Sequence, residues 1–245
     1  MIEIKASTHI QRLFANRLQK SDLFRAVYYA GYRGEEKDIP FYYTIEHGNS
    51  AVTDLRQTED EIFSSMKSNT RNEVRRAERE GCTFESGYDY DSFIPYYNTF
   101  CESKGLKDRV DMSRLIKYTG DNKVYITKAI HNDVVLSMHA TVVNKKEKVA
   151  FLLFSCSQRL DSGVDKKLIG WGNRYLHYMD LKTFKEMGIE EYEWSGVVLD
   201  PNDERYSIGQ FKLSFGGTVV NSLVLRTPLF NLMSYFRPLV ERFRH

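Results

Sequence analysis

The sequence contains few of the residues that build a disulfide framework or a thiolate zinc site. Its three cysteines, Cys82, Cys101 and Cys156, form no C-x-x-C pair, and its six histidines show neither H-x-H nor H-E-x-x-H spacing. An odd number of cysteines without such a pair is typical of a reducing compartment. We therefore expect a cytoplasmic protein without disulfides or a metal.

Long apolar runs and an excess of charge of one sign are also missing. No stretch approaches the length of a membrane span, and the start MIEIKASTHIQ lacks the basic and apolar regions of a signal peptide. Lys plus Arg total 35 and Asp plus Glu total 33, a formal net charge of +2. Such a balance does not indicate a nucleic-acid track or an anionic membrane surface. The expected partners are small molecules, with neither nucleic acid nor membrane among them.

No linker or internal repeat divides the 245 residues, and the 5 prolines are scattered. The apolar share of 42% and the charged share of 28% are those of a globular protein. Residues 1–57 predict a short helix near 7–19 and two strands rich in aromatic and β-branched residues, 23–32 and 40–46. We expect them to form a strand-rich extension or reduced subdomain in front of a core at 58–227.

Helical signals follow. Thr58-Glu-Asp-Glu61 has the Thr-x-x-Glu form of a capping box, in which each of the two side chains bonds a backbone N–H. Over 66–79 apolar residues recur at helical spacing while arginines crowd the other faces, and Gly81 is suited to end this basic amphipathic helix. Two more helices are predicted near 89–104 and 111–119.

The period then changes to two, which indicates strands. The segments 123–130, 134–144 and 149–157 are joined by short polar turns and predict an antiparallel meander. A long helix capped by Asp165 should end near Gly188 and lead into a strand at 191–197.

The remaining elements complete the predicted fold class. A short helix at 207–214, strands between 218 and 226, and a helix at 229–243 close the chain. This order indicates an α/β protein whose mixed, mostly antiparallel central sheet is flanked by helices, and it excludes a doubly wound parallel sheet. We expect the C-terminal stretch 228–245 to pack on the core or on a second subunit, as in a homodimer, and not on a membrane.

Three motifs make the chain similar to the Fem-type branch of the GNAT acyltransferases. The stretch 66–81 resembles that branch's Thr-Arg helix, which ends in Lys/Arg-Ala-x-x-x-Gly. Tyr192-Glu-Trp-Ser-Gly196 resembles its aromatic strand ending in glycine, and Phe211-Lys-Leu-Ser-Phe-Gly-Gly217 its Phe-Lys-x-x-Phe-Gly-Gly signature. The resemblance spans residues 58–226 and implies the GNAT acyltransferase fold.

The size of the chain narrows what this resemblance implies. Full Fem-type enzymes have two GNAT-like units, whereas this chain has room for one complete unit and a reduced N-terminal portion. Shorter relatives include N-acyltransferases that use acyl-CoA, some of which acylate nucleotide-linked amino sugars for surface polysaccharides such as the lipopolysaccharide O-antigen. The resemblance therefore implies coenzyme A as the acyl carrier and direct attack by the amine of such a sugar. An aminoacyl-tRNA-dependent transferase acting on a peptidoglycan precursor and a catalytically idle binding module remain alternatives.

The GNAT plan also suggests where the donor binds. There the pantetheine arm pairs with a splayed strand, here 149–157, and the pyrophosphate lies at the N-terminus of the next helix. A helix N-terminus disfavours cations, so Lys166 and Lys167 in its first turn fit a bound diphosphate; that both lysines simply point into water is the equal alternative. The predicted donor-binding residues are Phe154, Ser155, Ser157, Arg159, Gly163, Lys166 and Lys167.

Three residues are the candidates for catalysis. Lys212 is the lysine of the Phe-Lys-x-x-Phe-Gly-Gly signature, placed by the resemblance beside the reacting groups, where it would stabilise an oxyanion or hold a phosphate. The alternation of strand 134–144 turns His139 away from the predicted core. It is therefore a candidate base that faces a cleft, and the alternative is a hydrogen-bonded bystander. Tyr206 lies where many GNAT enzymes hold the acid for the thiolate. Cys156 is interpreted as a small hydrophobe and not as a nucleophile.

Four further residues are the candidates for binding the acceptor. Arg71 matches the family's Thr-Arg motif, and Trp194 belongs to the aromatic strand. Asp200 and Glu204 follow that strand and are suited to bind an amine or a sugar hydroxyl, although Asp200-Pro-Asn-Asp also reads as a solvated turn.

Overall fold

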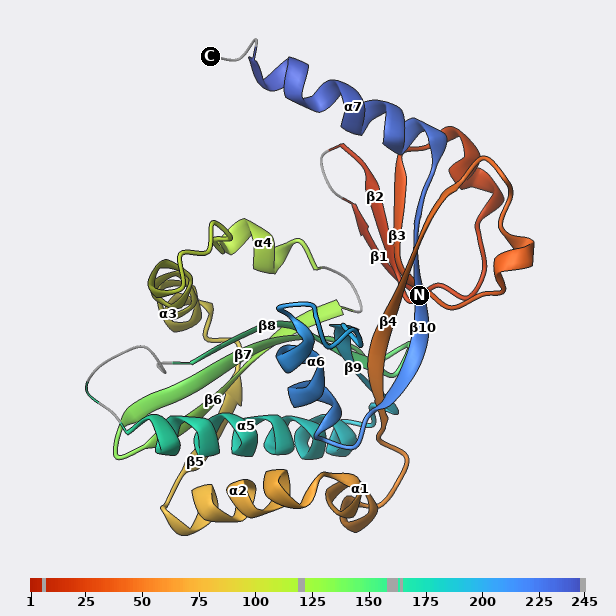
Figure 1. Cartoon of the computed structure of the whole chain (residues 1–245). Helices are drawn as coiled ribbons and strands as arrows, with labels where there is room; N and C mark the ends of the chain where they lie inside the picture. Colours follow the sequence, from red (N-terminus) through yellow and green to blue (C-terminus); the bar gives the residue numbers. More distant parts are fainter. Residues whose placement is uncertain (6–7, 119–121, 158–162, 164, 243–245) are drawn as a thin grey trace.

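A single ten-stranded sheet runs through the protein, with strand order β1-β2-β3-β10-β4-β9-β8-β7-β6-β5 (Figure 1). The computed structural model describes residues 1–5, 8–118, 122–157, 163 and 165–242, with no side chains described beyond 236. The strand pairs β2/β3 and β8/β9 are parallel and the other seven are antiparallel. The predicted fold class, a mixed and mostly antiparallel sheet flanked by helices, is confirmed.

The first strands form one end of this sheet. They are β1 (Ile2–Lys5), β2 (Ile10–Leu13), β3 (Val27–Tyr32) and β4 (Thr44–Asp54), with 3-10 turns at Lys20–Phe24 and Glu36–Asp38. The helix predicted near 7–19 is wrong, because residues 10–13 pair with β1 on one side and with β3 on the other. The predicted strand at 23–32 starts only at Val27, and the one at 40–46 starts later and runs on to Asp54.

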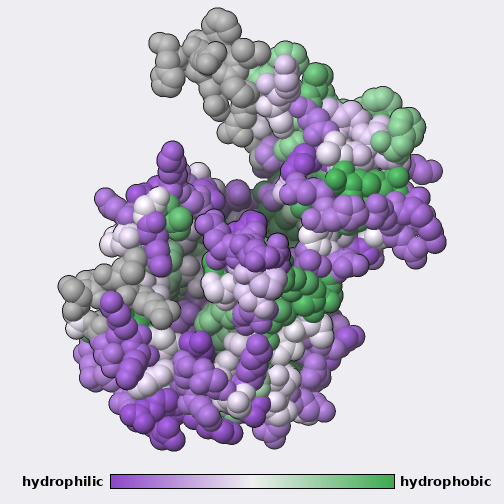
Figure 2. Space-filling view, viewed as in Figure 1, coloured by the Kyte–Doolittle hydropathy of each residue, from purple (hydrophilic) through white to green (hydrophobic). Residues whose placement is uncertain are grey.

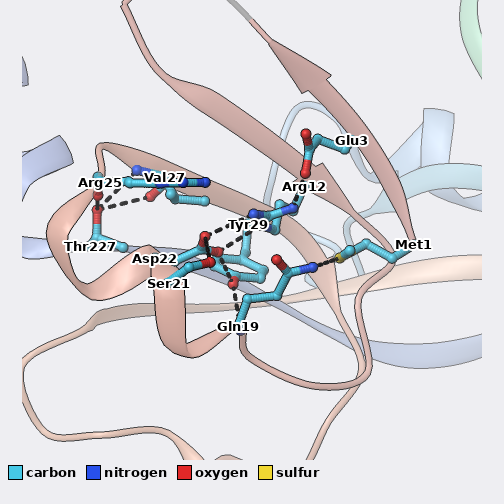
Figure 3. A network of polar contacts seen from close by, with 10 residues as sticks. All are labelled: Met1, Glu3, Arg12, Gln19, Ser21, Asp22, Arg25, Val27, Tyr29 and Thr227. Carbon is cyan, nitrogen blue, oxygen red and sulfur yellow. Dashed lines mark hydrogen bonds and ion pairs between the residues drawn. The ribbon is translucent and has the colours of Figure 1, made fainter.

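A buried ion pair explains why β2 is not a helix. The guanidinium of Arg12 donates from Nε and Nη2 to the two carboxylate oxygens of Asp22, at 2.6 and 2.8 Å, and it also contacts Glu3 (Figure 3). Tyr29 donates its hydroxyl to the same carboxylate. Burial opposes the charge of Asp22, but these hydrogen bonds outweigh it and lower its pKa. Contacts across the sheet therefore override the local helical pattern.

Helices cover both faces of the rest of the sheet. The next elements are α1 (Glu59–Ser65), α2 (Ser68–Arg79), β5 (Thr83–Gly87), α3 (Tyr90–Ser103) and α4 (Met112–Ile116). The capping box is present, since Thr58 Oγ1 accepts from the Glu61 N–H at 3.2 Å and Glu61 Oε2 accepts from the Thr58 N–H at 2.8 Å. Met66 and Lys67 have extended backbones, so α1 and α2 are separate helices.

The predicted meander is confirmed. It consists of β6 (Asn122–His131), β7 (Val134–Asn144) and β8 (Val149–Ser157), followed by α5 (Lys166–Glu186), β9 (Glu191–Val197), α6 (Tyr206–Leu213), β10 (Thr218–Arg226) and α7 (Pro228–Arg242). Where strands were predicted between 218 and 226, one strand forms. Helix α5 packs on β7 from the side of α2, and α3 packs on β7 and β8 from the opposite side (Figure 1).

Strands β4 and β10 join the two ends of the sheet. β10 pairs with β3 and with β4, and β4 in turn pairs with β9. The surface is hollowed between the part that holds β1–β3 and the part that holds α3–α6 (Figure 2). The division at residue 57 stays a prediction, because β4 belongs to both ends.

The C-terminal helix begins on the N-terminal strands. Phe230 of α7 contacts the rings of His9 and Tyr28, and the amide of Asn231 donates to Thr44 Oγ1 at 2.7 Å. Further along, Tyr235 is 76% exposed. None of the described helices is long and apolar enough to cross a lipid bilayer.

Candidate functional site

The parallel strands β8 and β9 start as a pair and then separate. Their register matches Val149 with Glu191, Ala150 with Tyr192 and Phe151 with Glu193. β8 continues to Ser157 and stays paired with β7 except at a bulge at Leu153, and β9 continues to Val197. In the described part of the chain, the β8 edge beyond Phe151 therefore has no strand beside it on the β9 side.

Ser195 lies at the point of separation. Its φ of 64° is left-handed, a conformation that non-glycine residues seldom adopt. Its side-chain Oγ donates to the Leu152 carbonyl oxygen at 2.9 Å. This side-chain bond lies just beyond Phe151 and Glu193, the last pair of residues in the β8/β9 register. The β4/β9 register also shifts here, with Ser50 opposite Gly196 but Val52 opposite Glu193. This bulge turns β9 away from β8.

Lys212 of α6 lies beside the place where β8 and β9 separate. Its Nζ donates to the Gly196 carbonyl oxygen at 2.9 Å. Burial lowers the pKa of Lys212 to about 8, an effect that the negative charge of Glu193 partly opposes. Helix α6 can approach the segment that follows β9 because Gly209 has no side chain: a Cβ there would lie 2.6 Å from the carbonyl oxygen of Val198.

Sequence reasoning missed Glu193 and Arg33. Glu193 is fully buried, and its Oε1 accepts from Ser50 Oγ at 2.6 Å and from the Ser195 N–H at 3.0 Å. Its Oε2 accepts from Arg33 Nη2 at 2.5 Å. Burial raises the pKa of Glu193 although Ser50 and Arg33 favour its charged form. A carboxylate between the aromatic residues Tyr192 and Trp194 was the available signal.

His139 does not face a cleft, so its predicted orientation is wrong, whereas the alternative of a hydrogen-bonded bystander agrees with its contacts. The imidazole is fully buried, with Nδ1 2.7 Å from Asp180 Oδ2 and Nε2 3.4 Å from Asn173 Oδ1. Both partners lie on α5, which covers this face of β7, while Met138 and Ala140 pack in the core on the opposite face. Alternation placed His139 correctly relative to Met138 and Ala140, but both faces of the strand are buried.

A second histidine extends this buried polar cluster. The potential ligand atoms of His139, His177 and Asp180 lie within 4.8 Å of one another. His177 Nδ1 and Asp180 Oδ1 have no hydrogen-bond partner in the described structure. Burial, followed by the charges of His139 and Lys212, holds the pKa of His177 well below its usual value. Imidazole and carboxylate are suitable zinc ligands, but the close contact of His139 with Asp180 already engages two of these groups. The absence of a metal stays a prediction.

Trp194 belongs to the core, and Arg71 is a half-buried residue that bonds the end of a helix. Trp194 is fully buried, donates from Nε1 to Thr53 Oγ1 at 2.9 Å, and stacks on Phe215 with ring centroids 4.9 Å apart. Its predicted contact with the acceptor is therefore wrong. Arg71 donates from Nη1 to the carbonyl oxygens of Ser64, at 2.8 Å, and of Met66. These bonds satisfy the C-terminal end of α1 and give the arginine a structural role.

The predicted donor residues lie along β8 and at the start of α5. Ser155 and Ser157 are half-buried on the separated part of β8, whereas Phe154 packs on the Tyr97 ring at 4.9 Å. Gly163 and both Lys166 and Lys167 are exposed, the lysines in the first turn of α5. Arg159 lies outside the described residues.

The remaining candidates are spread over the segment from β9 to α6. Asp200 and Glu204 are exposed, and Asp200 Oδ1 accepts from the Asn202 N–H at 2.9 Å, as expected of the turn interpretation. Tyr206 begins α6 and is half-buried. It lies six residues before Lys212, roughly 9 Å along the helix axis. Cys156 is buried, which raises the pKa of its thiol and agrees with a hydrophobic role.

Solved structures share this fold, although neither a family model nor a curated protein sequence matches the chain. FemX is similar with a TM-score of 0.63 and 13% identity, over 86% of this chain and 74% of its own. L-PGS from Bacillus licheniformis is similar with a TM-score of 0.60 and 13% identity, over 98% of this chain and 85% of its own. A conserved protein of unknown function from Bacteroides thetaiotaomicron VPI-5482 has a TM-score of 0.59 and 9% identity, over 92% and 81%. The chain therefore shares the fold of FemX and of L-PGS.

Proposed function

We propose that this protein is an acyltransferase that moves an acyl group from acyl-CoA to a primary amine. The observation that carries the proposal is the separation of β8 from β9 beside a half-buried lysine. The exposed polar groups of a strand edge can hydrogen-bond an extended amide-containing chain, as an added β-strand does. A pantetheine arm is such a chain, and the free edge of β8 from Leu153 to Ser157 is suited to bind it.

Lys212 supplies the positive charge that the reaction needs. When the amine nitrogen attacks the thioester carbonyl, a C–N bond forms and negative charge develops on the carbonyl oxygen. Collapse of this intermediate breaks the C–S bond, and the proton lost by the amine balances the one gained by the thiolate. Protonated Lys212, anchored at Gly196 next to the separation, is positioned to stabilise the oxygen. Tyr206 is the candidate proton donor to the thiolate.

The start of α5 is suited to the phosphate end of the donor. Asp165 caps the helix through the Lys167 N–H at 2.9 Å, and the side chains of Lys166 and Lys167 extend into solvent. A helix N-terminus with two nearby cations attracts a diphosphate. β8 directly precedes α5 in the chain, so the pantetheine and pyrophosphate sites would be successive.

For the acceptor we propose the amine of a nucleotide-linked amino sugar, attacked directly without a covalent acyl-enzyme. Burial of Cys156 supports direct transfer, because no other cysteine lies in the separated strands. A second candidate function is transfer from an aminoacyl-tRNA to a peptidoglycan precursor. It is favoured by the likeness to FemX over 86% of this chain.

The test is release of free thiol when the purified protein is mixed with acyl-CoA and amino-sugar nucleotides. Lys212→Met should lower kcat by about 100-fold or more, as expected when one stabilising donor is removed. Lys107→Met, which changes an exposed lysine beyond α3, should have no effect. Loss of transfer after ribonuclease treatment of a complete extract would instead indicate the tRNA donor. No turnover with either donor would favour a catalytically idle binding module.

A further inference from the structure

A polar pocket adjoins the site described so far and shares Arg33 with it. Its volume is about 470 Å³, and it is formed by the end of β3, the turn after it, and the middle of β4 and β10. The side chains with polar groups in its lining are those of Tyr32, Arg33, Glu36, His47, Asn49 and Asn221. A pocket of this size holds a monosaccharide-sized ligand.

The positive charge of the pocket is already neutralised. Arg33 donates from Nη1 to Glu191 Oε1 and from Nη2 to Glu193 Oε2, both at 2.5 Å. Glu36 adds a further carboxylate to the lining, 3.6 Å from His47 Nε2. A phosphate or carboxylate entering the pocket would therefore meet a locally negative environment, because two carboxylates pair with the guanidinium and Glu36 adds a third to the lining.

Two amides supply the hydrogen-bonding capacity. Asn49 and Asn221 are direct partners in the β4/β10 register, so their side chains project from the same face of the sheet. Among the described residues, neither side chain has a hydrogen-bond partner. Each amide offers two N–H donors and an acceptor oxygen, which match the donor and acceptor character of sugar hydroxyls.

The pocket is next to the proposed reaction site. Asn49 pairs with Val197 of β9, and the following residue, Ser50, pairs with Gly196. The Gly196 carbonyl is the group that holds Lys212 Nζ. Ser50 projects from the opposite face of β4 to Asn49 and bonds Glu193, the residue that holds Arg33. A ligand in the pocket is thus one strand away from the separation of β8 and β9.

We infer that this pocket binds the uncharged, hydroxyl-rich end of the acceptor, with Asn49 and Asn221 hydrogen-bonding its hydroxyls. The inference rests on the proposed acyl transfer. It adds the place where the acceptor binds and the kind of group, hydroxyls, that its bound end presents. The amine points from the pocket toward Lys212, and any phosphate of the acceptor lies outside the pocket.

Binding of simple sugars to the whole protein, without any donor, tests this assignment. Ligand-observed NMR should give saturable binding of glucose and glucosamine and at least about 10-fold weaker binding of glucosamine 6-phosphate. Asn49→Ala and Asn221→Ala should each weaken glucosamine binding by about 5- to 10-fold, the loss expected for one or two hydrogen bonds. Asn69→Ala, on the exposed face of α2, is the matched control and should bind as the wild type does.

Three results would overturn the assignment: no saturable binding of either sugar, unchanged binding in both pocket variants, or tighter binding of the phosphorylated sugar. Thermal unfolding of each variant shows whether a loss of binding reflects a loss of folding. Because no donor is present, the result is separate from the thiol assay. Sugar binding that depends on Asn49 and Asn221 but without any acyl transfer would support the pocket assignment and contradict the proposed transferase activity. Acyl transfer without such sugar binding would support the activity and contradict the pocket assignment.

Discussion

The side chain of Lys212 donates to the carbonyl oxygen of Gly196 at 2.9 Å, which joins the last residue of the aromatic motif to the lysine of the Phe-Lys-x-x-Phe-Gly-Gly motif. The two motifs are close in the sequence and also in space, because the loop after β9 brings α6 back to that strand. The bond fixes the ammonium near the place where β8 and β9 separate. Lys212 is also half-buried, which lowers its pKa. This shift should make both the stability and the activity of the protein depend on pH.

The first consequence concerns stability. The pKa of Lys212 in the folded protein, about 8, is below the ordinary value of 10.5, so the unfolded chain binds more protons between these two pH values. The wild type should therefore gain stability relative to Lys212→Met as the pH rises through this window. We expect Lys212→Met to stabilise the protein by about 1–3 kcal/mol at pH 7 and by less at pH 10. Urea unfolding at both pH values measures this, and Lys107→Met should show no such dependence.

The second consequence concerns activity. Stabilising an oxyanion requires a charged Lys212, and its pKa of about 8 means that the charge is lost just above neutral pH. An arginine keeps its charge throughout. We expect the ratio of kcat in the wild type to kcat in Lys212→Arg to fall as the pH rises from 7 to 9. A constant ratio would mean that the charge of Lys212 does not act in the rate-limiting step.

Ser195 should control donor binding and not the chemical step. Ser195→Gly tolerates the left-handed φ of 64° but loses the hydroxyl bond to Leu152, whereas Ser195→Val adds a β-branched side chain that this φ strains. We expect KM for acyl-CoA to rise about 5-fold in the glycine variant and more in the valine variant, with little change in kcat. Steady-state kinetics measure both constants. A fall in kcat with an unchanged KM would contradict the proposed position of the donor.

His139 should matter for folding and not for turnover. His139→Ala removes a fully buried side chain and leaves Asp180 without its hydrogen-bond partner, so we expect a loss of about 2–5 kcal/mol of unfolding free energy. The protein that remains folded should keep kcat within about 3-fold of the wild type, since the imidazole has no exposed surface. Active-site titration corrects kcat for unfolded protein. His131→Ala, at the end of β6, is the control, and a large loss of kcat would restore a catalytic role for His139.

Local signals in the sequence were enough to predict much of the fold. The capping box at Thr58 and the glycine at position 188, with a φ of 80°, mark helix ends through contacts within a few residues. The meander was predictable because short turns join its strands. β2 was not, because its four residues are held by β1 and β3, and by the bond between Arg12 and Asp22.

The site was less predictable than the fold. Lys212 and the β8 strand could be chosen from the motifs, but Glu193 acquires its role from Arg33, a residue 160 positions earlier in the chain. The parity of β7 separated its two faces but could not tell that α5 buries the face of His139. Pairings this distant leave no mark on the spacing of residues.

The placement of β10 between β3 and β4 constrains how the protein can be assembled. The hydroxyl of Thr227 accepts from the N–H of Val27 at 3.0 Å, across 200 residues of chain. The N-terminal strands leave the ribosome long before this partner is made, and until then the facing edges of β3 and β4 stay unpaired. The N-terminal strands should therefore form a stable sheet only after β10 has been synthesised. A fragment ending before Thr218 should be prone to aggregate.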